Sequence, residues 1–519
     1  MLQRINFPEL FFGLVAPIGV DLGETLKELE SSLRLFGYEV VPIKVTDLFR
    51  KIDFCDCSLE DRPSEERFKS YINFGNRIRE LTNDRAICAA LVIDQISRQR
   101  DLDASQKPLH KEKRAFVIHQ FKRKEEIDLL RAVYGKLFFQ ISVYSSRGER
   151  SDSFSQRIAR DHQSTDLERY KPTADELIKL DEDQEGHEWG QRVRDVFHLA
   201  DFIINKDISQ TQGDQLHRFI ELIFGRSDIS PNKVEYGMYM AKAAALRSLD
   251  LSRQVGAAVF TERSEIITLG CNEVPKGGGG TYWSDEKNDA RDFKWEGDPN
   301  DERKKALVSD FLQRLRERKL LSEVAIQDVD EMLKDKLLND ALLMDIIEFG
   351  RIIHAEMSAL IDAARLGRSV QDGVLFCTTF PCHLCAKHIV GAGIKRVYFL
   401  EPYPKSAAFS LHPDSIEVEG TSRVHFKEYN KTEFVHFHGI SPRRYRDFFE
   451  KTKRKDKDGK AMHWMFDPPM PILDIKLPIY IALEDYVQKS LAQSIDRARK
   501  RIAEETDLFR VGNSTSEPA

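Results

Sequence analysis

Residues 351–404 read RIIHAEMSALIDAARLGRSVQDGVLFCTTFPCHLCAKHIVGAGIKRVYFLEPYP, and this stretch decides the fold around it. It holds His354 and Glu356, followed after 24 intervening residues by the run PCHLC at 381–385. One imidazole and two thiolates are three of the ligands that a tetrahedral zinc ion takes, and a catalytic zinc keeps its fourth position for water. The sequence therefore predicts Zn²⁺ bound by His354, Cys382 and Cys385.

The same stretch predicts alternating short helices and strands. An alanine-rich helix ends at Gly367, an apolar β-branched run follows, and Pro381 then opens a second helix. The two cysteines share its first turn, where the helix N-terminus favours the metal-binding thiolate. The expected elements are a helix at 352–366, a strand at 374–380, a helix at 381–390 and a strand at 396–400.

Glu356 lies two residues after the histidine and can carry a proton between a water and a substrate nitrogen. The order H-x-E, then P-C-x-x-C, is typical of zinc-dependent nucleobase deaminases. The alternatives are a set of unrelated core residues, or a structural zinc, which would need a fourth protein ligand. The sequence offers four residues for that place: His383, His388, Cys377 and Cys271.

Composition sets broad limits on the rest of the chain. The 519 residues suffice for two or three domains. With 41% hydrophobic residues, 32% charged residues and a formal net charge of −6, nothing favours a general affinity for nucleic acids or membranes. No apolar run has membrane-spanning length, the N-terminus lacks a signal-peptide pattern, and seven cysteines are too few for a disulfide framework. We expect a cytoplasmic protein with no membrane partner.

Residues 1–230 predict a separate α/β domain. Strands alternate with helices there, which indicates a parallel sheet covered on both faces. The expected strands are 9–16, 38–45, 114–119, 136–143 and 200–204, and the expected helices are 23–36, 64–98, 124–134 and 212–224.

The first turn of this domain, GLVAPIGVD at 13–21, lies where a phosphate-binding loop would lie. It has five residues between Gly13 and Gly19, and then Val20 and Asp21 instead of the lysine and hydroxyl of a P-loop. Gly13 and Gly19 are candidate phosphate-binding positions, but we do not expect phosphoryl transfer. The arginine-rich run 147–162 suits either a phosphate-clamping lid or a solvated helix.

Residues 231–505 predict a second domain around the zinc motif, followed by a disordered tail at 506–519. A helix at 238–249 and a hairpin at 252–270 precede a loop with Asn272, which either binds a sugar hydroxyl or forms a turn. Tyr403 suits stacking on a base or a solvent-exposed turn. An insertion at 277–350, with helices expected at 304–318, 323–334 and 338–349, suits a lid or an oligomer contact. Later elements are expected at 424–437, 445–451 and 483–504.

The run HAEMSAL…TTFPCHLCAKHIVGAGIKRVYF resembles the deoxycytidylate deaminase family. The resemblance extends to Arg247-Ser248, to RQVGA at 253–257 and to GCN at 270–272, so it covers roughly 236–275 and 350–405. It departs from the family at Ile353 and Ser358, where members often carry tyrosine and asparagine, and at the insertion. These departures leave the preferred number of phosphates open.

Together with the N-terminal domain, the chain resembles bacterial anti-phage deoxycytidylate deaminases, a P-loop-kinase-like domain fused to a zinc-dependent deaminase. The resemblance implies zinc on His354, Cys382 and Cys385, Glu356 as proton shuttle, Asn272 at the deoxyribose, and Arg247 or Arg253 near the phosphate. It further implies dCMP and dCTP as substrates, depletion of that pool during phage infection, an inhibitory small RNA and a homo-oligomer.

The expected fold class is therefore α/β: a P-loop-kinase-like parallel-sheet domain, then a cytidine-deaminase-like α/β/α domain with a helical insertion. Two other functions stay open. A polynucleotide cytosine or adenine deaminase would need a basic and aromatic groove, which the charge runs do not show. A catalytically idle zinc scaffold that binds RNA or protein would not need Glu356.

Overall fold

The computed structural model describes residues 3–104, 108–184, 186–295, 297–320, 332–333, 341–403, 405–418, 431–451, 454–462, 464 and 469–514. The chain divides into two compact units. The first contains Met1–Glu235 and Phe437–Ala519, and the second contains Tyr236–His436. Within the described part of the chain, no helix has the length and apolar character needed to cross a membrane.

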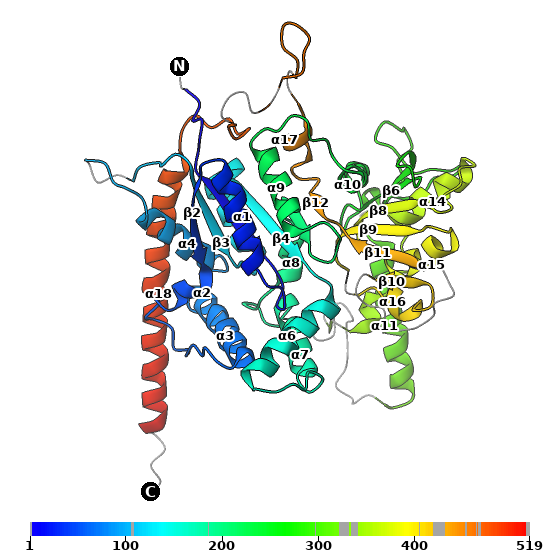
Figure 1. The fold of residues 1–519 in the computed structure, drawn as a ribbon. Helices are drawn as coiled ribbons and strands as arrows, with labels where there is room; N and C mark the ends of the chain where they lie inside the picture. The colour runs from blue at the N-terminus through cyan, green and yellow to red at the C-terminus, as the bar shows by residue number, and fades with distance from the viewer. Residues whose placement is uncertain are drawn as a thin grey trace. The chain divides into compact units, whose positions relative to one another are not determined.

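The first unit is built on a six-stranded sheet of order β12-β5-β4-β1-β3-β2 (Figure 1). Its strands are β1 (Leu10–Val15), β2 (Glu39–Lys44), β3 (Arg114–His119), β4 (Phe138–Tyr144), β5 (Phe202–Asn205) and β12 (Gly439–Ile440). The first five run parallel, which confirms the predicted parallel sheet, and β12 adds an antiparallel edge. All six residues of β1 are buried between β3 and β4, as expected for a continuous apolar run.

Helices cover this sheet in groups. Helices α1 and α9 pack on each other, α4 packs on α5 and α18, and α3, α6 and α7 pack together. The expected helix at 64–98 is two helices, because Asn83 adopts a left-handed conformation and ends the first of them. The bounds are α1 (Gly23–Leu35), α2 (Val45–Phe49), α3 (Ser64–Thr82), α4 (Ile87–Arg98), α5 (Lys124–Tyr134), η1 (Gly135–Leu137), α6 (Arg147–Asp161), α7 (Lys171–Glu182), α8 (Val193–Phe197), α9 (Gln212–Ile223), α17 (Tyr445–Phe449) and α18 (Tyr480–Ser514).

The predicted domain boundary is wrong for the C-terminal segment, which belongs to the first unit. The sequence placed 231–505 in one domain, but β12 pairs with β5 and α18 packs on α3, α4 and α5 of the first unit. Glu484 on α18 forms a fully buried ion pair with Arg100 at 2.8 Å, and its neighbour Gln488 donates to Asp94. The helix also continues to Ser514, into the stretch expected to be a disordered tail.

The second unit has a six-stranded sheet of order β10-β11-β9-β8-β6-β7. Strands β6 and β7 form the predicted antiparallel hairpin, and β8, β9, β11 and β10 run parallel. The bounds are β6 (Gly256–Phe260), β7 (Ile266–Cys271), β8 (Val374–Thr379), β9 (Arg396–Glu401), β10 (Ile416–Val418) and β11 (Thr432–His436). Part of the expected strand pair at 424–437 lies outside the described residues.

Helix α14 (Ala355–Arg365) packs on β6 and β7 and against α15 (His383–Gly391). Their apolar faces share one core with the sheet, which includes Ala359, Ile389 and Val397. The remaining helices near this sheet are α10 (Lys233–Ala245), which begins five residues before the predicted helix, and α16 (Ala408–Leu411).

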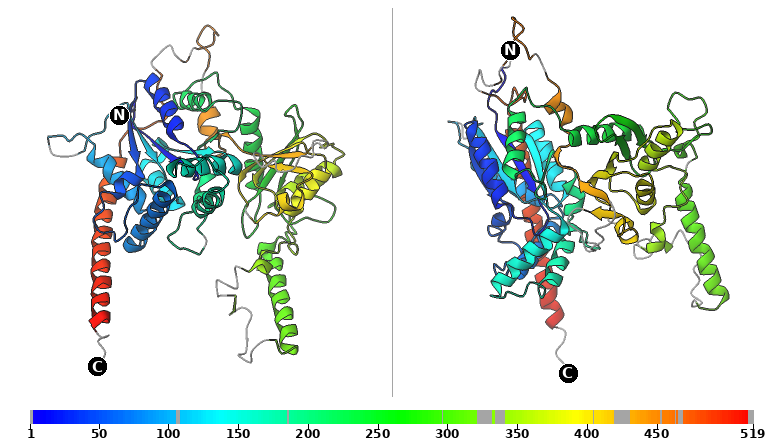
Figure 2. Two further views of the ribbon diagram at one scale, coloured as in Figure 1. Left: turned by 60° about the horizontal axis from the view of Figure 1, so that its bottom comes forward. Right: turned by 45° about the vertical axis from the view of Figure 1, so that its right-hand side comes forward.

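The insertion contains η2 (Asp292–Lys294) and the long helix α11 (Pro299–Glu317). In both views of Figure 2, α11 extends away from the sheet of its own unit. The helix expected at 338–349 is wrong for the described residues, which contain only the short 3-10 helix η3 (Leu342–Asp345). The helix expected at 323–334 lies almost entirely outside the described residues.

Candidate active site

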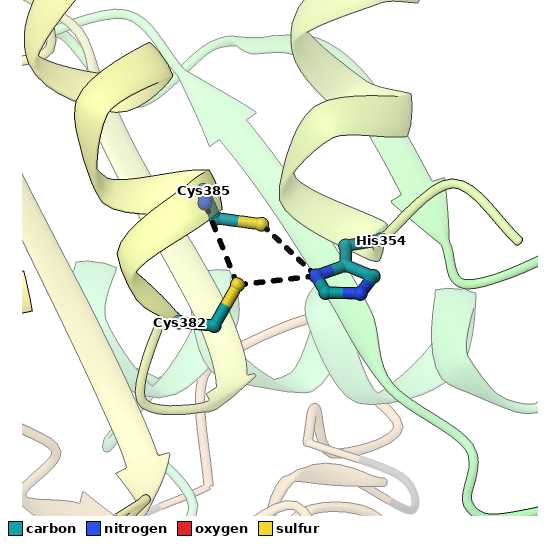
Figure 3. A group of neighbouring side chains, drawn as sticks. All are labelled: His354, Cys382 and Cys385. Atoms are coloured by element: carbon teal, nitrogen blue, oxygen red, sulfur yellow. Dashed lines mark hydrogen bonds between the residues drawn. The ribbon is translucent and has the colours of Figure 1, made fainter. Parts of the chain in front are cut away.

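The three predicted ligands lie at the starts of two neighbouring helices (Figure 3). His354 immediately precedes α14, and Cys382 immediately precedes α15 and accepts a hydrogen bond from the Cys385 amide. Pro381 lacks an amide hydrogen and follows β8 closely, so the strand ends and the chain turns into the helix. The local sequence thus brings one imidazole and two thiols to the same point.

The geometry of this trio fits a zinc ion. The His354 Nδ1 atom lies 3.2 Å from the Cys382 sulfur and 3.4 Å from the Cys385 sulfur. Zinc bonds of about 2.3 Å to sulfur and about 2.0 Å to nitrogen at tetrahedral angles separate such ligands by about 3.5 Å. The two sulfurs are buried, and all three ligand atoms lie within 4.8 Å of one another. The site therefore has the donor types and spacing that zinc requires.

Electrostatics prepares one thiol for metal binding. The hydrogen bond from the Cys385 thiol lowers the pKa of Cys382 to about 4, and His354 contributes in the same direction. The same sulfur pair and burial raise the pKa of Cys385. Since thiolate is the form that binds metal, Cys382 is ready to bind zinc at neutral pH.

The described part of the chain adds no fourth ligand to this trio. Cys377 lies within β8 and donates to the Tyr398 carbonyl, and Cys271 ends β7. His383 is directed to Glu348 at 3.6 Å, and His388 contacts the Leu384 carbonyl. The alternative of a closed structural site therefore lacks its fourth donor among these residues.

Glu356 lies in the first turn of α14, next to the metal ligands. Its side chain is buried, and its Oε2 atom lies 3.6 Å from the Cys385 sulfur. Burial raises the pKa of this carboxyl group, and His354 opposes the shift. Glu356, His354 and Cys382 all line one cavity of about 220 Å³. A proton-transferring group and the metal ligands therefore face the same space.

A glycine on the neighbouring strand sets the position of α14. At Gly270 on β7 a Cβ atom would lie 2.5 Å from the Ala359 nitrogen and closer still to the Ala355 carbonyl oxygen. Only glycine allows the helix this close approach. Gly270 therefore fixes how far His354 and Glu356 stand from the sheet.

Asn272 lies in the cavity wall, but its side chain holds the protein's own loop. Its amide nitrogen donates to the Asp250 carboxylate and to the Arg253 carbonyl, each at 2.8 Å, and its oxygen accepts from the Val255 amide at 2.7 Å. Asn272 thus braces the loop 250–255 at the cavity.

Two of the other predicted substrate contacts meet at this cavity, and one does not. Arg253 and Tyr403 both line it, with the guanidinium 5.2 Å from the ring centroid. Arg247 lies elsewhere: it donates to the Thr281 hydroxyl and stacks on the Trp283 ring at 3.9 Å. Its structural role is to hold the start of the insertion.

Sequence reasoning missed several residues of the cavity wall. Asp250, Ser252, Ile347, Thr379 and Phe380 line it together with the predicted residues. The position of Thr379 and Phe380 directly before PCHLC was a usable signal, because the end of β8 must meet the metal site. Ile347 lies at the far end of the insertion, and no local pattern indicates its place.

The two candidate phosphate-binding glycines lie in the first unit. Gly13 is inside β1, paired with Ile118 of β3 and Gln140 of β4, and so is not part of a loop. Gly19 does lie in the loop after β1, with a φ of +94° that favours glycine.

Residues 231–401 match the family model of the cytidine and deoxycytidylate deaminase zinc-binding region. This match confirms the predicted Zn²⁺ cofactor and the predicted enzyme domain of deoxycytidylate-deaminase type. It covers one stretch of the chain, and the first unit lies almost entirely outside it.

Individual relatives match shorter stretches. The deoxycytidylate deaminase of Enterobacteria phage T2 is 43% identical over 54 residues, which is 10% of this chain and 29% of that protein. ComE operon protein 2 of Bacillus subtilis is 42% identical over 53 residues, 10% of this chain and 28% of that protein. Mouse deoxycytidylate deaminase is 26% identical over 166 residues, 32% of this chain and 63% of that protein. The chain thus spans less than a third of the first two relatives.

Among solved structures, the dCMP deaminase of cyanophage S-TIM5 in its apo form aligns at 18% identity with a TM-score of 0.21. The alignment covers 40% of this chain and 99% of that chain.

Proposed function

We propose that this protein hydrolytically deaminates deoxycytidine nucleotides, converting dCMP and dCTP to dUMP and dUTP with release of ammonia. The observation that carries the proposal is the shared cavity: Glu356 faces the same space as His354 and Cys382. A purely structural zinc would not need a buried carboxyl group beside its ligands. The relatives named above as deoxycytidylate deaminases support deoxycytidine nucleotides as the substrate class.

The chain's residues divide the chemistry between them. Bound zinc supplies a Lewis acid that lowers the pKa of an attacking water. Glu356 accepts a proton from that water and delivers it to N3 of cytosine, which makes C4 electrophilic. After the water oxygen has bonded to C4, Glu356 takes the remaining proton of that hydroxyl and transfers it to the exocyclic amine; the C4–N bond breaks, ammonia departs and C4 becomes a carbonyl. His354, Cys382 and Cys385 fix the position at which this occurs.

Arg253 and Tyr403 of the cavity wall suit the phosphate end of a nucleotide, away from the base. Arg253 is exposed and stacks on Tyr403, and none of the described residues forms an ion pair with it. A guanidinium with free donors binds phosphate well. We assign Arg253 to the phosphate and Tyr403 to stacking, and leave Arg247 out of the substrate contacts.

The finer parts of the proposal rest on the resemblance to anti-phage enzymes. They are activity on dCTP, depletion of the deoxycytidine nucleotide pool during phage infection, a small RNA as inhibitor, and a homo-oligomer in the cytoplasm. The presence of a separate α/β unit beside the deaminase-type region supports this arrangement.

Ammonia release by the purified full chain tests the function, with zinc content measured in parallel. The substrates are dCMP, dCTP, CMP, CTP and single-stranded DNA. Glu356→Gln should retain zinc and lose activity by about 10²- to 10⁴-fold. Asp362→Asn is the matched control, since Asp362 lies on the same helix and pairs with the exposed Arg365 at 3.0 Å.

The outcomes separate the competing functions. Turnover of dCMP or dCTP that Glu356→Gln abolishes and Asp362→Asn retains supports the proposal. Turnover confined to single-stranded DNA would instead identify a polynucleotide deaminase. A zinc-loaded chain freed of bound RNA and inactive on every substrate would identify an idle scaffold and reject the proposal.

A further inference from the structure

A second and larger cavity lies in the first unit, at the carboxyl ends of its central strands. Its volume is about 730 Å³, within the range of about 300–1,000 Å³ of small-molecule sites. Its wall includes the loop 17–23 after β1, the junction of β2 and α2 at 44–46, and His119 and Gln120 at the end of β3. Open parallel sheets bind their ligands in this place.

Three backbone amides of the loop after β1 already donate to the protein's own acceptors. The Ile18 amide donates to the buried Asp181 carboxylate at 2.8 Å. The Val20 amide donates to the Pro17 carbonyl at 3.3 Å, and the Gly23 amide donates to Asp21 at 2.9 Å. A phosphate held by these three amides would have to displace these bonds.

Free positive charge lies instead on α3 and α6. Arg67 of α3 and Arg157 and Arg160 of α6 line the cavity, and none of them forms an ion pair with any described residue. The Arg157 Nε atom donates only to the Ser64 hydroxyl, at 3.1 Å. The charge of Arg157 is one of the contributions that lower the pKa of the nearby Asp161. These guanidinium groups keep donors available for an anion.

Two further cations of the cavity wall are neutralised by ion pairs. Arg79 pairs with Glu126 at 2.9 Å, and Lys122 pairs with Asp181 at 2.7 Å. Of the remaining groups, Lys44 lies 3.7 Å from Asp47, which does not line the cavity, and Asp21 is the lining carboxylate without a cation partner. The balance of charge available to a ligand is therefore positive and is concentrated on the arginine wall.

Aromatic rings pack against two of these arginines. The Arg67 guanidinium lies 4.6 Å from the Tyr71 ring centroid, and Arg157 lies 5.7 Å from that of Phe68. Phe154 meets Phe68 edge to face at 5.0 Å. A planar, uncharged group can stack on such a surface while a linked anion contacts the guanidinium groups.

We propose that this cavity binds a nucleotide, with its phosphates on Arg67, Arg157 and Arg160 and its base against Phe68 and Tyr71. The inference does not depend on the proposed deamination, because the two cavities share no lining residue. It moves the expected phosphate site from the glycine loop to the wall formed by α3 and α6.

Calorimetric titration of the full chain with ATP, GTP, dTTP and pyrophosphate tests the proposal. At least one nucleotide should bind, and Arg157→Gln combined with Arg160→Gln should weaken it by tenfold or more. Both arginines are exposed, so the double variant should fold normally. Arg169→Gln is the matched control, an exposed arginine of the same unit that lies outside the cavity. Excess dCMP should not displace the bound nucleotide.

Three results would overturn the proposal. One is the absence of binding by all three nucleotides at millimolar concentration. Another is equal affinity in the double variant and the wild-type chain. Pyrophosphate binding as tightly as the best nucleotide would remove the aromatic half of the site, since the base would then contribute nothing.

Discussion

Replacing Gly270 by alanine should disable the zinc site without touching any of its ligands. The added Cβ would lie 2.5 Å from the Ala359 nitrogen, whereas real Cβ atoms keep at least 3.0 Å from such atoms. Helix α14 must therefore move from β7 by at least about 0.5 Å, the limit within which catalytic groups must be held. His354 and Glu356 move with it, and a displacement of about 1 Å costs about 10²-fold in rate. We expect at least a tenfold fall in kcat/KM.

The assay is ammonia release from dCMP and dCTP, with zinc content and the unfolding transition measured on the same samples. Overpacking should also lower stability by about 1–3 kcal/mol. Gly391→Ala is the matched control, because a Cβ at Gly391, the last residue of α15, would meet no atom within 4 Å. A Gly270→Ala variant with activity within threefold of wild type would refute the argument that this glycine sets the position of the site.

Two further predictions concern the first unit. Glu484→Ala should lower the free energy of unfolding by about 3–5 kcal/mol in urea denaturation, because it leaves Arg100 buried without one of its partners, whereas Lys489→Ala on the same helix should cost less than about 1 kcal/mol. A small effect of Glu484→Ala would contradict the packing of α18 on this unit. Burial lowers the pKa of His119 from 6.5 to about 4, so the folded state binds fewer protons than the unfolded chain between these values. The free energy of unfolding should therefore fall by about 2–3 kcal/mol as the pH drops from 6.5 toward 4.5, because the unfolded chain takes up the proton that buried His119 refuses. The free energy of unfolding of His119→Gln should fall less over the same pH interval.

The local pattern of the sequence was enough to predict the elements around the metal site. Strand 374–380 and helix 381–390 were placed within two residues of β8 and α15, because a β-branched run, a proline and a glycine mark their ends. The ligand trio was predicted with them, because the ligand residues and the signals that start their helices both lie within this short stretch of sequence. The long-range arrangement of the chain was not accessible in this way.

Two misplacements show why. Helix α18 follows the deaminase-type region in sequence, yet it packs on the first unit through the buried Arg100–Glu484 pair. Arg247 or Arg253 was expected near the phosphate, yet Arg247 stacks on Trp283. The partner of Glu484 on α18, Arg100, lies far away along the chain, and the partner of Arg247, Trp283, lies within the insertion. A local sequence pattern does not show which distant surface a side chain will contact.

The hydrogen bonds of Asn272 limit how this residue could contact the sugar of a nucleotide. Both hydrogens of its amide are already donated, to Asp250 and to the Arg253 carbonyl. Its oxygen accepts one bond, from the Val255 amide, and a carbonyl oxygen has a second lone pair. A sugar hydroxyl that contacts Asn272 must therefore donate to it. Because the same bonds hold the loop that carries Arg253, such a contact would couple the binding of the sugar to the position of Arg253, the proposed phosphate ligand.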